Sequence, residues 1–248
     1  MENLVNNEND IEKIENTNDK NKKDATLSHV ESSLIQLKKL MTNYTDNPDT
    51  ISNADDLAYW IEDFCRYMNF KEDFKPNYLK TYNRGDIIKV NLGYNIGNEE
   101  SGLHYCVVLD KNNPKSSGII TVVPLTSYKG KDMHFSSVFL KDEIYNNFKE
   151  KYDMLEAEFI SKVDSVLKKQ SDQQKIEEAL KELNFLMKMY TQMSKMKKGS
   201  VALVSQITTI SKQKILDPQK KYDILSGLRL SDESLDLINE KIKQLYVK

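Results

Sequence analysis

Two expected strand ends in the middle of the chain carry the side chains best suited to chemistry. His104 stands at the start of one expected strand, directly after the long polar segment 93–102. Another expected strand ends in Thr126 and Ser127, with Lys129 two residues further on. An imidazole can transfer protons near neutral pH, and hydroxyl and ammonium groups can donate hydrogen bonds to a phosphate. The alternative interpretation makes His104 a structural strand-edge residue and the Thr-Ser pair a turn former.

Metal and cofactor chemistry has no support in the residue spacing. His29, His104 and His134 are far apart, and no HExxH or paired-ligand spacing occurs. The sequence contains no Walker A loop, no GxGxxG and no GxSxG motif. Cys65 and Cys106 lie inside apolar patterns without CxxC spacing, as is typical of reduced core cysteines in a cytoplasmic protein. We therefore expect neither a metal nor a cofactor.

Composition narrows the class of protein further. The chain has 248 residues, 39% of them hydrophobic, which is enough for one or two domains with a real core. No apolar run approaches the roughly 18–20 residues that span a bilayer, and the N-terminus has no secretory h-region. Residues 1–83 carry 10 Lys/Arg and 16 Asp/Glu, a net charge of −6, and the remaining 26 Lys/Arg and 22 Asp/Glu give +4. An acidic N-terminal segment followed by a mildly basic remainder is compatible with a nucleic-acid partner. It is equally compatible with an ordinary solvated surface.

The N-terminal third predicts a tail and a helical extension. Residues 1–25 have almost no apolar content and are expected to be a disordered acidic and polar tail. Residues 26–80 are expected to form helices, because apolar residues recur at steps of three and four on both sides of a break at 43–52. The two apolar stripes consist of Leu27, Val30, Leu34, Leu37 and Met41, and of Leu57, Ile61, Phe64 and Met68.

The central and C-terminal parts predict an α+β protein. Residues 86–92, 104–109, 119–125, 135–140 and 201–204 are short, rich in β-branched residues and bounded by turn residues, so they predict strands. Short strands with short connections suggest a small antiparallel barrel. The period reverts to that of a helix over 148–166 and 176–190, which predicts a hairpin, and again over 235–245, in a helix capped near Ser231. We expect that replacing 145–196 with a short loop leaves the barrel folded.

Several ordered blocks of sequence together resemble a known family. They are the segments 84–92 (RGDIIKVNL), 97–105 (GNEESGLHY), 107–109 (VVL) and 122–127 (VVPLTS), with a distal block at 199–214. This pattern is similar to that of the MazF/PemK toxin family of type II toxin-antitoxin systems. The resemblance covers about 81–141 and 199–248, and the tail 1–25, the extension 26–80 and the inserted helical hairpin 142–198 lie outside it.

The resemblance implies a fold, an activity and partners. The implied fold is an SH3-like small β-barrel with a C-terminal helix, here carrying the inserted hairpin and the N-terminal extension. The implied activity is metal-independent endoribonuclease cleavage of single-stranded RNA or mRNA, which leaves a 2′,3′-cyclic phosphate. The implied partners are the RNA substrate, a cognate antitoxin protein and a second copy in a homodimer, in the cytoplasm and without a membrane.

One site residue departs from the family pattern. The family's Thr maps onto Thr126, whereas the position of its Arg falls on His104, and these two are the candidate catalytic residues. Arg is a permanent phosphate clamp, whereas His carries a pH-dependent charge and can transfer protons. An alternative is therefore a catalytically weakened or inactive PemK-like barrel that binds nucleic acid (DNA or RNA) or protein. The secondary candidates for substrate contact are Glu99, Ser127, Lys129 and Gln206.

Overall fold

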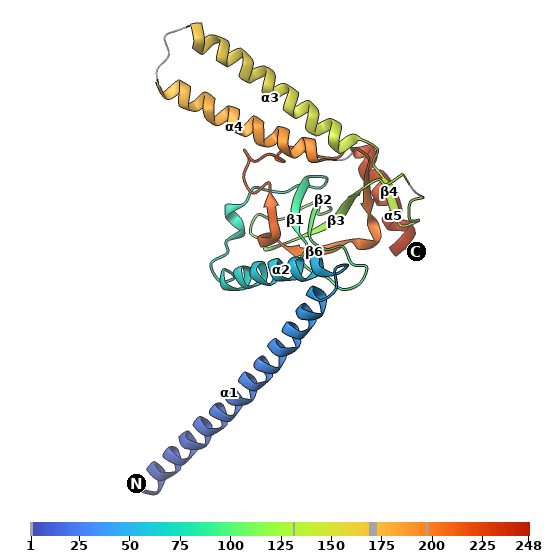
Figure 1. Cartoon of the computed structure of the whole chain (residues 1–248). Helices are drawn as coiled ribbons and strands as arrows, with labels where there is room; N and C mark the ends of the chain where they lie inside the picture. The colour runs from blue at the N-terminus through green and yellow to red at the C-terminus, as the bar shows by residue number, and fades with distance from the viewer. Residues whose placement is uncertain (1, 131, 169–172, 197) are drawn as a thin grey trace. The chain divides into compact units, whose positions relative to one another are not determined.

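A computed structural model describes residues 2–130, 132–168, 173–196 and 198–248. The chain divides into two compact units, Met1–Cys65 and Arg66–Lys248. Each unit is described by itself, and Figure 1 gives the element labels used below.

The first unit consists of two helices. α1 spans Glu2–Thr45 and α2 spans Ile51–Asn69, so the predicted break at 43–52 is confirmed. The connection is held by the Thr50 hydroxyl, which donates to the carbonyl of Tyr44 at 3.1 Å, and by an Asn47 side chain that accepts from the Asp49 amide at 2.9 Å. α1 also includes residues 2–25, which differs from the disorder expected from their composition. Glu and Lys residues cost a helix little, so the amphipathic segment that follows can propagate helix through them toward the N-terminus.

The boundary between the units falls earlier than the expected domain border at residue 80. Leu79 and Tyr82 are buried in a core of the second unit, and Phe74 packs against the same core. The Tyr82 hydroxyl donates to the carbonyl of Pro218 at 2.7 Å, which fastens this segment to the C-terminal part of the chain. The segment from Phe74 onward is therefore part of the sheet unit, because its apolar side chains cover the sheet.

The second unit is built on an antiparallel sheet (Figure 1). Its strands are β1 (Ile87–Asn91), β2 (Leu103–Val108), β3 (Ile119–Ser127), β4 (Ser137–Phe139), β5 (Ser200–Leu203), β6 (Thr208–Ser211) and β7 (Ile215–Asp217). The strand order is β4-β5-β3-β2-β1-β7, and β6 pairs with β3. The predicted mixed α and β architecture is confirmed. Within the described residues no pairing of β4 with β7 closes the path into a barrel.

Alternation along the strands creates two faces, each with its own core. On β3, Val123 and Leu125 belong to one apolar cluster, while Ile120 and Val122 belong to the other. Successive side chains of a strand point to opposite sides of a sheet, so these clusters lie on its two faces. The face that carries Val123 is called the helix-covered face. The opposite face, which carries Ile120, is called the His104 face, because His104 is shown below to lie on it.

The hairpin helices help to build the helix-covered face. α3 (Glu143–Lys168) and α4 (Gln173–Lys195) follow β4 and precede β5 in the chain. The two helices lie side by side in space (Figure 1). At the base of the hairpin Ile144, Phe148 and Met189 are at most 3% exposed and belong to the same cluster as Val123. The structure therefore argues against our expectation that 145–196 can be replaced with a short loop, because that change removes Phe148 and Met189 from the main core.

The last helix, α5 (Asp232–Tyr246), also packs on this core through Leu235 and Ile238. Its predicted cap is confirmed: the Ser231 hydroxyl accepts a hydrogen bond from the amide of Ser234 at 3.2 Å. None of the helices that the structure describes combines the length and the apolar character needed to cross a lipid bilayer.

Candidate active site

His104 is held between two acceptors. It is the second residue of β2, opposite Val90 of β1, and its ring is half-buried. Nδ1 lies 3.0 Å from the carbonyl oxygen of Leu125, and Nε2 lies 3.2 Å from a carboxylate oxygen of Glu100. A carbonyl and an ionised carboxylate both only accept, so the form that satisfies both contacts is the imidazolium, with a proton on each nitrogen. Each ring nitrogen of His104 therefore has an acceptor at hydrogen-bond distance.

Thr126 lies next to His104 on the same face of the sheet. The register of β2 and β3 pairs Cys106 with Pro124, and two residues further along each strand lie His104 and Thr126. Alternation puts His104 on the side of Cys106, and Thr126 on the side of Val122. Both side chains are thus on the His104 face, and both residues are half-buried. The structure brings the two predicted catalytic residues together.

The loop between β1 and β2 positions Glu100. The loop is closed at its base by the amide of Leu92, which donates to the carbonyl of Gly102 at 2.8 Å, and by that of Gly102, which donates to Gly93 at 2.7 Å. Inside it, the Asn95 side chain donates to the backbone carbonyl of Glu100 at 2.7 Å. These hydrogen bonds fold the loop back over the strand that it precedes, and the Glu100 carboxylate thereby reaches the imidazole.

A polar cavity of about 370 Å³ adjoins this arrangement at Glu100, and neither His104 nor Thr126 belongs to its lining. The β1–β2 loop supplies Glu99 and Glu100 to its lining, and the segment after β5 supplies Gln206. Gln206 Nε2 donates to the carbonyl of Asn98 at 3.0 Å and so ties the two segments together. The remaining lining residues are Leu92, Asn95, Pro124, Ser205, Ile207, Thr208, Thr209, Ile210 and Lys214. Glu99 and Gln206, two predicted substrate-contact residues, thus share one cavity.

Ser127 and Lys129 lie elsewhere. Ser127 is the last residue of β3 and pairs with Ser200 of β5. Alternation puts its side chain on the opposite face from that of Thr126. Lys129 is exposed in the turn that follows, and neither residue belongs to the cavity lining. Their role in substrate contact stays a prediction without support from their positions.

Two charged residues of this site were not singled out in the sequence. Glu100 lies in the family-like segment 97–105, but only the folded loop brings its carboxylate to His104. Lys214 ends the distal block, lines the cavity and donates from Nζ to the carbonyl of Leu92 at 3.1 Å. Burial lowers the pKa of the Lys214 ammonium group, because desolvation disfavours its charged form. A half-buried ammonium group at the cavity is suited to hold a phosphate.

A hydrogen-bonded chain of hydroxyls also reaches the cavity. Ser136 is 2% exposed, and its hydroxyl lies 2.6 Å from Nδ1 of His134 and 2.9 Å from the Ser205 hydroxyl. Ser205 lines the cavity, so the chain connects His134 with that space. No sequence signal pointed to it, because 69 residues separate Ser136 from Ser205.

The site has the groups that phosphodiester chemistry needs. It offers an imidazole, a hydroxyl, an ammonium group and a carboxylate, which can donate to, stabilise or accept protons around a phosphate. Within the described part of the chain, no group of three or more His, Cys, Asp or Glu residues could hold a metal ion. The imidazole, hydroxyl, ammonium and carboxylate groups can supply acid–base and electrostatic chemistry.

The comparison with protein families gives the class. Residues 83–184 match the family model described as "PemK-like, MazF-like toxin of type II toxin-antitoxin system". The match supports the family resemblance seen in the sequence blocks. It extends through α3 into α4, and it ends before the distal block at 199–214. No curated protein gives a significant match.

Proposed function

We propose that this chain is the toxin of a type II toxin-antitoxin system and acts as a metal-independent endoribonuclease on single-stranded RNA. The observation that carries the proposal is the placement of His104 beside Thr126, next to a polar cavity, within the family-matched segment. In this proposal the curled antiparallel sheet acts as an SH3-like barrel. A second copy and an antitoxin protein are the partners, and the cytoplasm is the compartment.

The proposed reaction is an attack of the RNA 2′-hydroxyl on the adjacent phosphorus. The bond from phosphorus to O2′ forms, and the bond from phosphorus to O5′ breaks, which leaves a 2′,3′-cyclic phosphate and a 5′-hydroxyl. Glu100 accepts the proton of the 2′-hydroxyl, and the His104 imidazolium gives a proton to O5′. The two groups lie 3.2 Å apart, so a proton can return from Glu100 to His104 after each turnover.

Thr126 and Lys214 stabilise the negative charge that develops on the phosphate in the transition state. The Thr126 hydroxyl donates a hydrogen bond to a non-bridging oxygen of the phosphorane, and the Lys214 ammonium group offsets its negative charge. Glu99 and Gln206 contact the neighbouring nucleotides from the cavity wall. The roles match the chemistry of the side chains that the fold assembles on this face.

A second candidate function is favoured by one observation. Two carboxylates, Glu99 and Glu100, line the cavity, and Glu100 occupies the Nε2 side of His104. Carboxylates repel a scissile phosphate, which supports a PemK-like domain with weakened or lost catalysis that acts as a binding module instead.

One experiment separates the two functions. The purified chain is incubated with a mixed-sequence single-stranded RNA in EDTA, and the fragment ends are analysed. Site-specific fragments with cyclic-phosphate ends support the endoribonuclease. Intact RNA, with the probe retained on the protein in a salt-dependent manner, supports the binding domain instead. His29→Ala, on exposed α1, is the control for His104→Ala.

A further inference from the structure

An apolar seam runs along α1. Leu27, Val30, Leu34, Leu37 and Met41 alternate steps of three and four, and Tyr44 continues the pattern. This is the spacing of the a and d positions of a heptad repeat, which supports contact with another helix along one face. Leu27, Val30 and Leu34 are 48–58% exposed, so the N-terminal half of the seam faces solvent.

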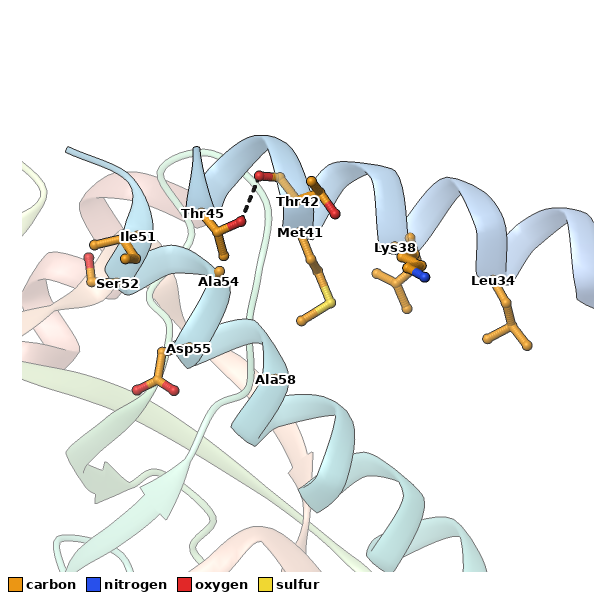
Figure 2. Close-up of a pocket in the computed structure, with 11 residues that line it drawn as sticks. Leu34, Lys38, Met41, Thr42, Thr45, Ile51, Ser52, Ala54, Asp55 and Ala58 are labelled. Carbon is orange, nitrogen blue, oxygen red and sulfur yellow. Dashed lines mark hydrogen bonds between the residues drawn. The ribbon is translucent and has the colours of Figure 1, made fainter. Parts of the chain in front are cut away.

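The C-terminal half of the seam opens into a groove between α1 and α2. The groove has a volume of about 820 Å³, and Figure 2 shows Leu34 and Met41 on one side of it, with Ala54 and Ala58 on α2 on the other. Two alanines four residues apart on a helix leave room for the close approach of a further helix. Lys38 and Asp55 also line the groove. Its shape and lining suit an amphipathic helix.

We propose that a second copy of this chain occupies the groove, with its α1 running antiparallel to the first α1. In this arrangement, residues at heptad position a of one seam pack against residues at position d of the other. Leu34 then pairs with Leu37 of the partner copy, and Met41 pairs with Val30 of the partner copy. Each α1 then extends past the α2 of its own chain to cover the exposed half of the other seam. The product is a four-helix bundle of two α1 and two α2 helices.

The charges that flank the seam favour this orientation. With Leu27 at position a, Glu31 and Lys38 both fall at position e. In an antiparallel pair the e positions of the two helices face each other, so Glu31 of each copy meets Lys38 of the other, twice by symmetry. In a parallel pair Glu31 faces Thr26 and Lys38 faces Ser33, and no opposite charges meet. The chain is thus complementary to itself only when antiparallel.

Cross-linking of the full chain tests both the contact and its direction. Glu31→Cys and Lys38→Cys proteins, each in a Cys65→Ser background, are mixed and treated with a short bismaleimide; Cys106 is buried. We expect cross-links between the two variants and few within either variant alone. Lys38→Glu should weaken the self-association about two- to thirtyfold, and adding Glu31→Lys to it should restore the association.

A pair of matched variants locates the contact on the seam. Leu34→Asp should abolish the cross-link, whereas Ile35→Asp, at an exposed apolar position outside the seam, should leave it. Circular dichroism of each variant checks that the helices persist. Cross-links of like with like, or none at all, would overturn the proposal, as would equal effects of the two Asp variants. These outcomes are independent of RNA cleavage, so they are distinct from failure of the proposed function.

Discussion

The two faces of the sheet differ in what covers them and in the side chains that they carry. The helix-covered face is closed by the base of the α3–α4 hairpin and by α5, and side chains such as Phe148 and Ile238 are fully buried there. The His104 face has an apolar core near Ile88 and Tyr82, but it changes along β2 and β3 into a polar cavity with paired charges. Both faces are made by the same strands, so alternate residues of one strand serve stability and the site.

The two faces also differ in the environment that they give to side chains. On the His104 face the imidazole of His104 has two acceptors, the carbonyl of Leu125 and the carboxylate of Glu100. On the helix-covered face the packing is apolar, so a cavity there costs stability and has no bearing on the chemistry. Substitutions on the two faces should therefore separate activity from stability.

The largest effect is expected at His104. His104→Ala should lower cleavage by about 10²–10⁴-fold with the fold retained, because it removes a proton donor from the phosphate. His104→Arg tests the nature of that role through the pH–rate profile. An Arg variant as active as the wild type, with a flat profile, would show that the position supplies charge. An inactive but folded Arg variant would support proton transfer. Unchanged rates in both variants would remove His104 from the site.

The opposite pattern is expected at Phe148. Phe148→Ala should lower the free energy of unfolding by about 3–5 kcal/mol, because the side chain is fully buried in the main core. Cleavage per folded molecule should stay close to that of the wild type. Met154→Ala on the same helix is the control, since Met154 is exposed. Chemical denaturation measures the stabilities, and equal losses in the two variants would contradict the packing of the hairpin base.

Thr126 should have a smaller effect on cleavage than His104. Thr126→Ala removes one hydrogen bond to the developing phosphorane and should lower the cleavage rate by roughly 10²-fold. Thr191→Ala, an exposed position on α4, is the matched control. Single-turnover kinetics compares the two variants, and an unaltered rate for Thr126→Ala would return this residue to a structural role.

The smallest effect is expected at Ser231 on the helix-covered side. Ser231→Ala removes the side-chain acceptor at the start of α5 and should lower stability by about 1 kcal/mol, with cleavage per folded molecule unchanged. Ser231→Asp, which retains an acceptor, should keep the stability of the wild type. Thermal unfolding of the three proteins checks the order, and a Ser231→Ala protein as stable as the wild type would show that the cap contributes nothing.

Local pattern was enough to predict most elements and part of the site. Five of the strands, α2 to α5 and the part of α1 from residue 26 onward follow from periodicity, and Ser231 follows from its place before an apolar stripe. β6 and β7 were not predicted from the sequence. His104 and Thr126 could be chosen because each stands at the end of a recognisable strand within a family-like block.

The sequence by itself determined the types of residue at the strand ends, the periods of the helices and the similarity of residues 83–184 to the PemK-like, MazF-like toxins. Only the tertiary structure decided which of them meet. Glu100 reaches His104 because the β1–β2 loop folds back. Lys214 lines the cavity and is hydrogen-bonded to Leu92, which is 122 residues away in the sequence. Phe148 makes the base of the hairpin part of the hydrophobic core. Periodicity is a local property, whereas strand register, loop closure and packing join distant residues, and these fix the site.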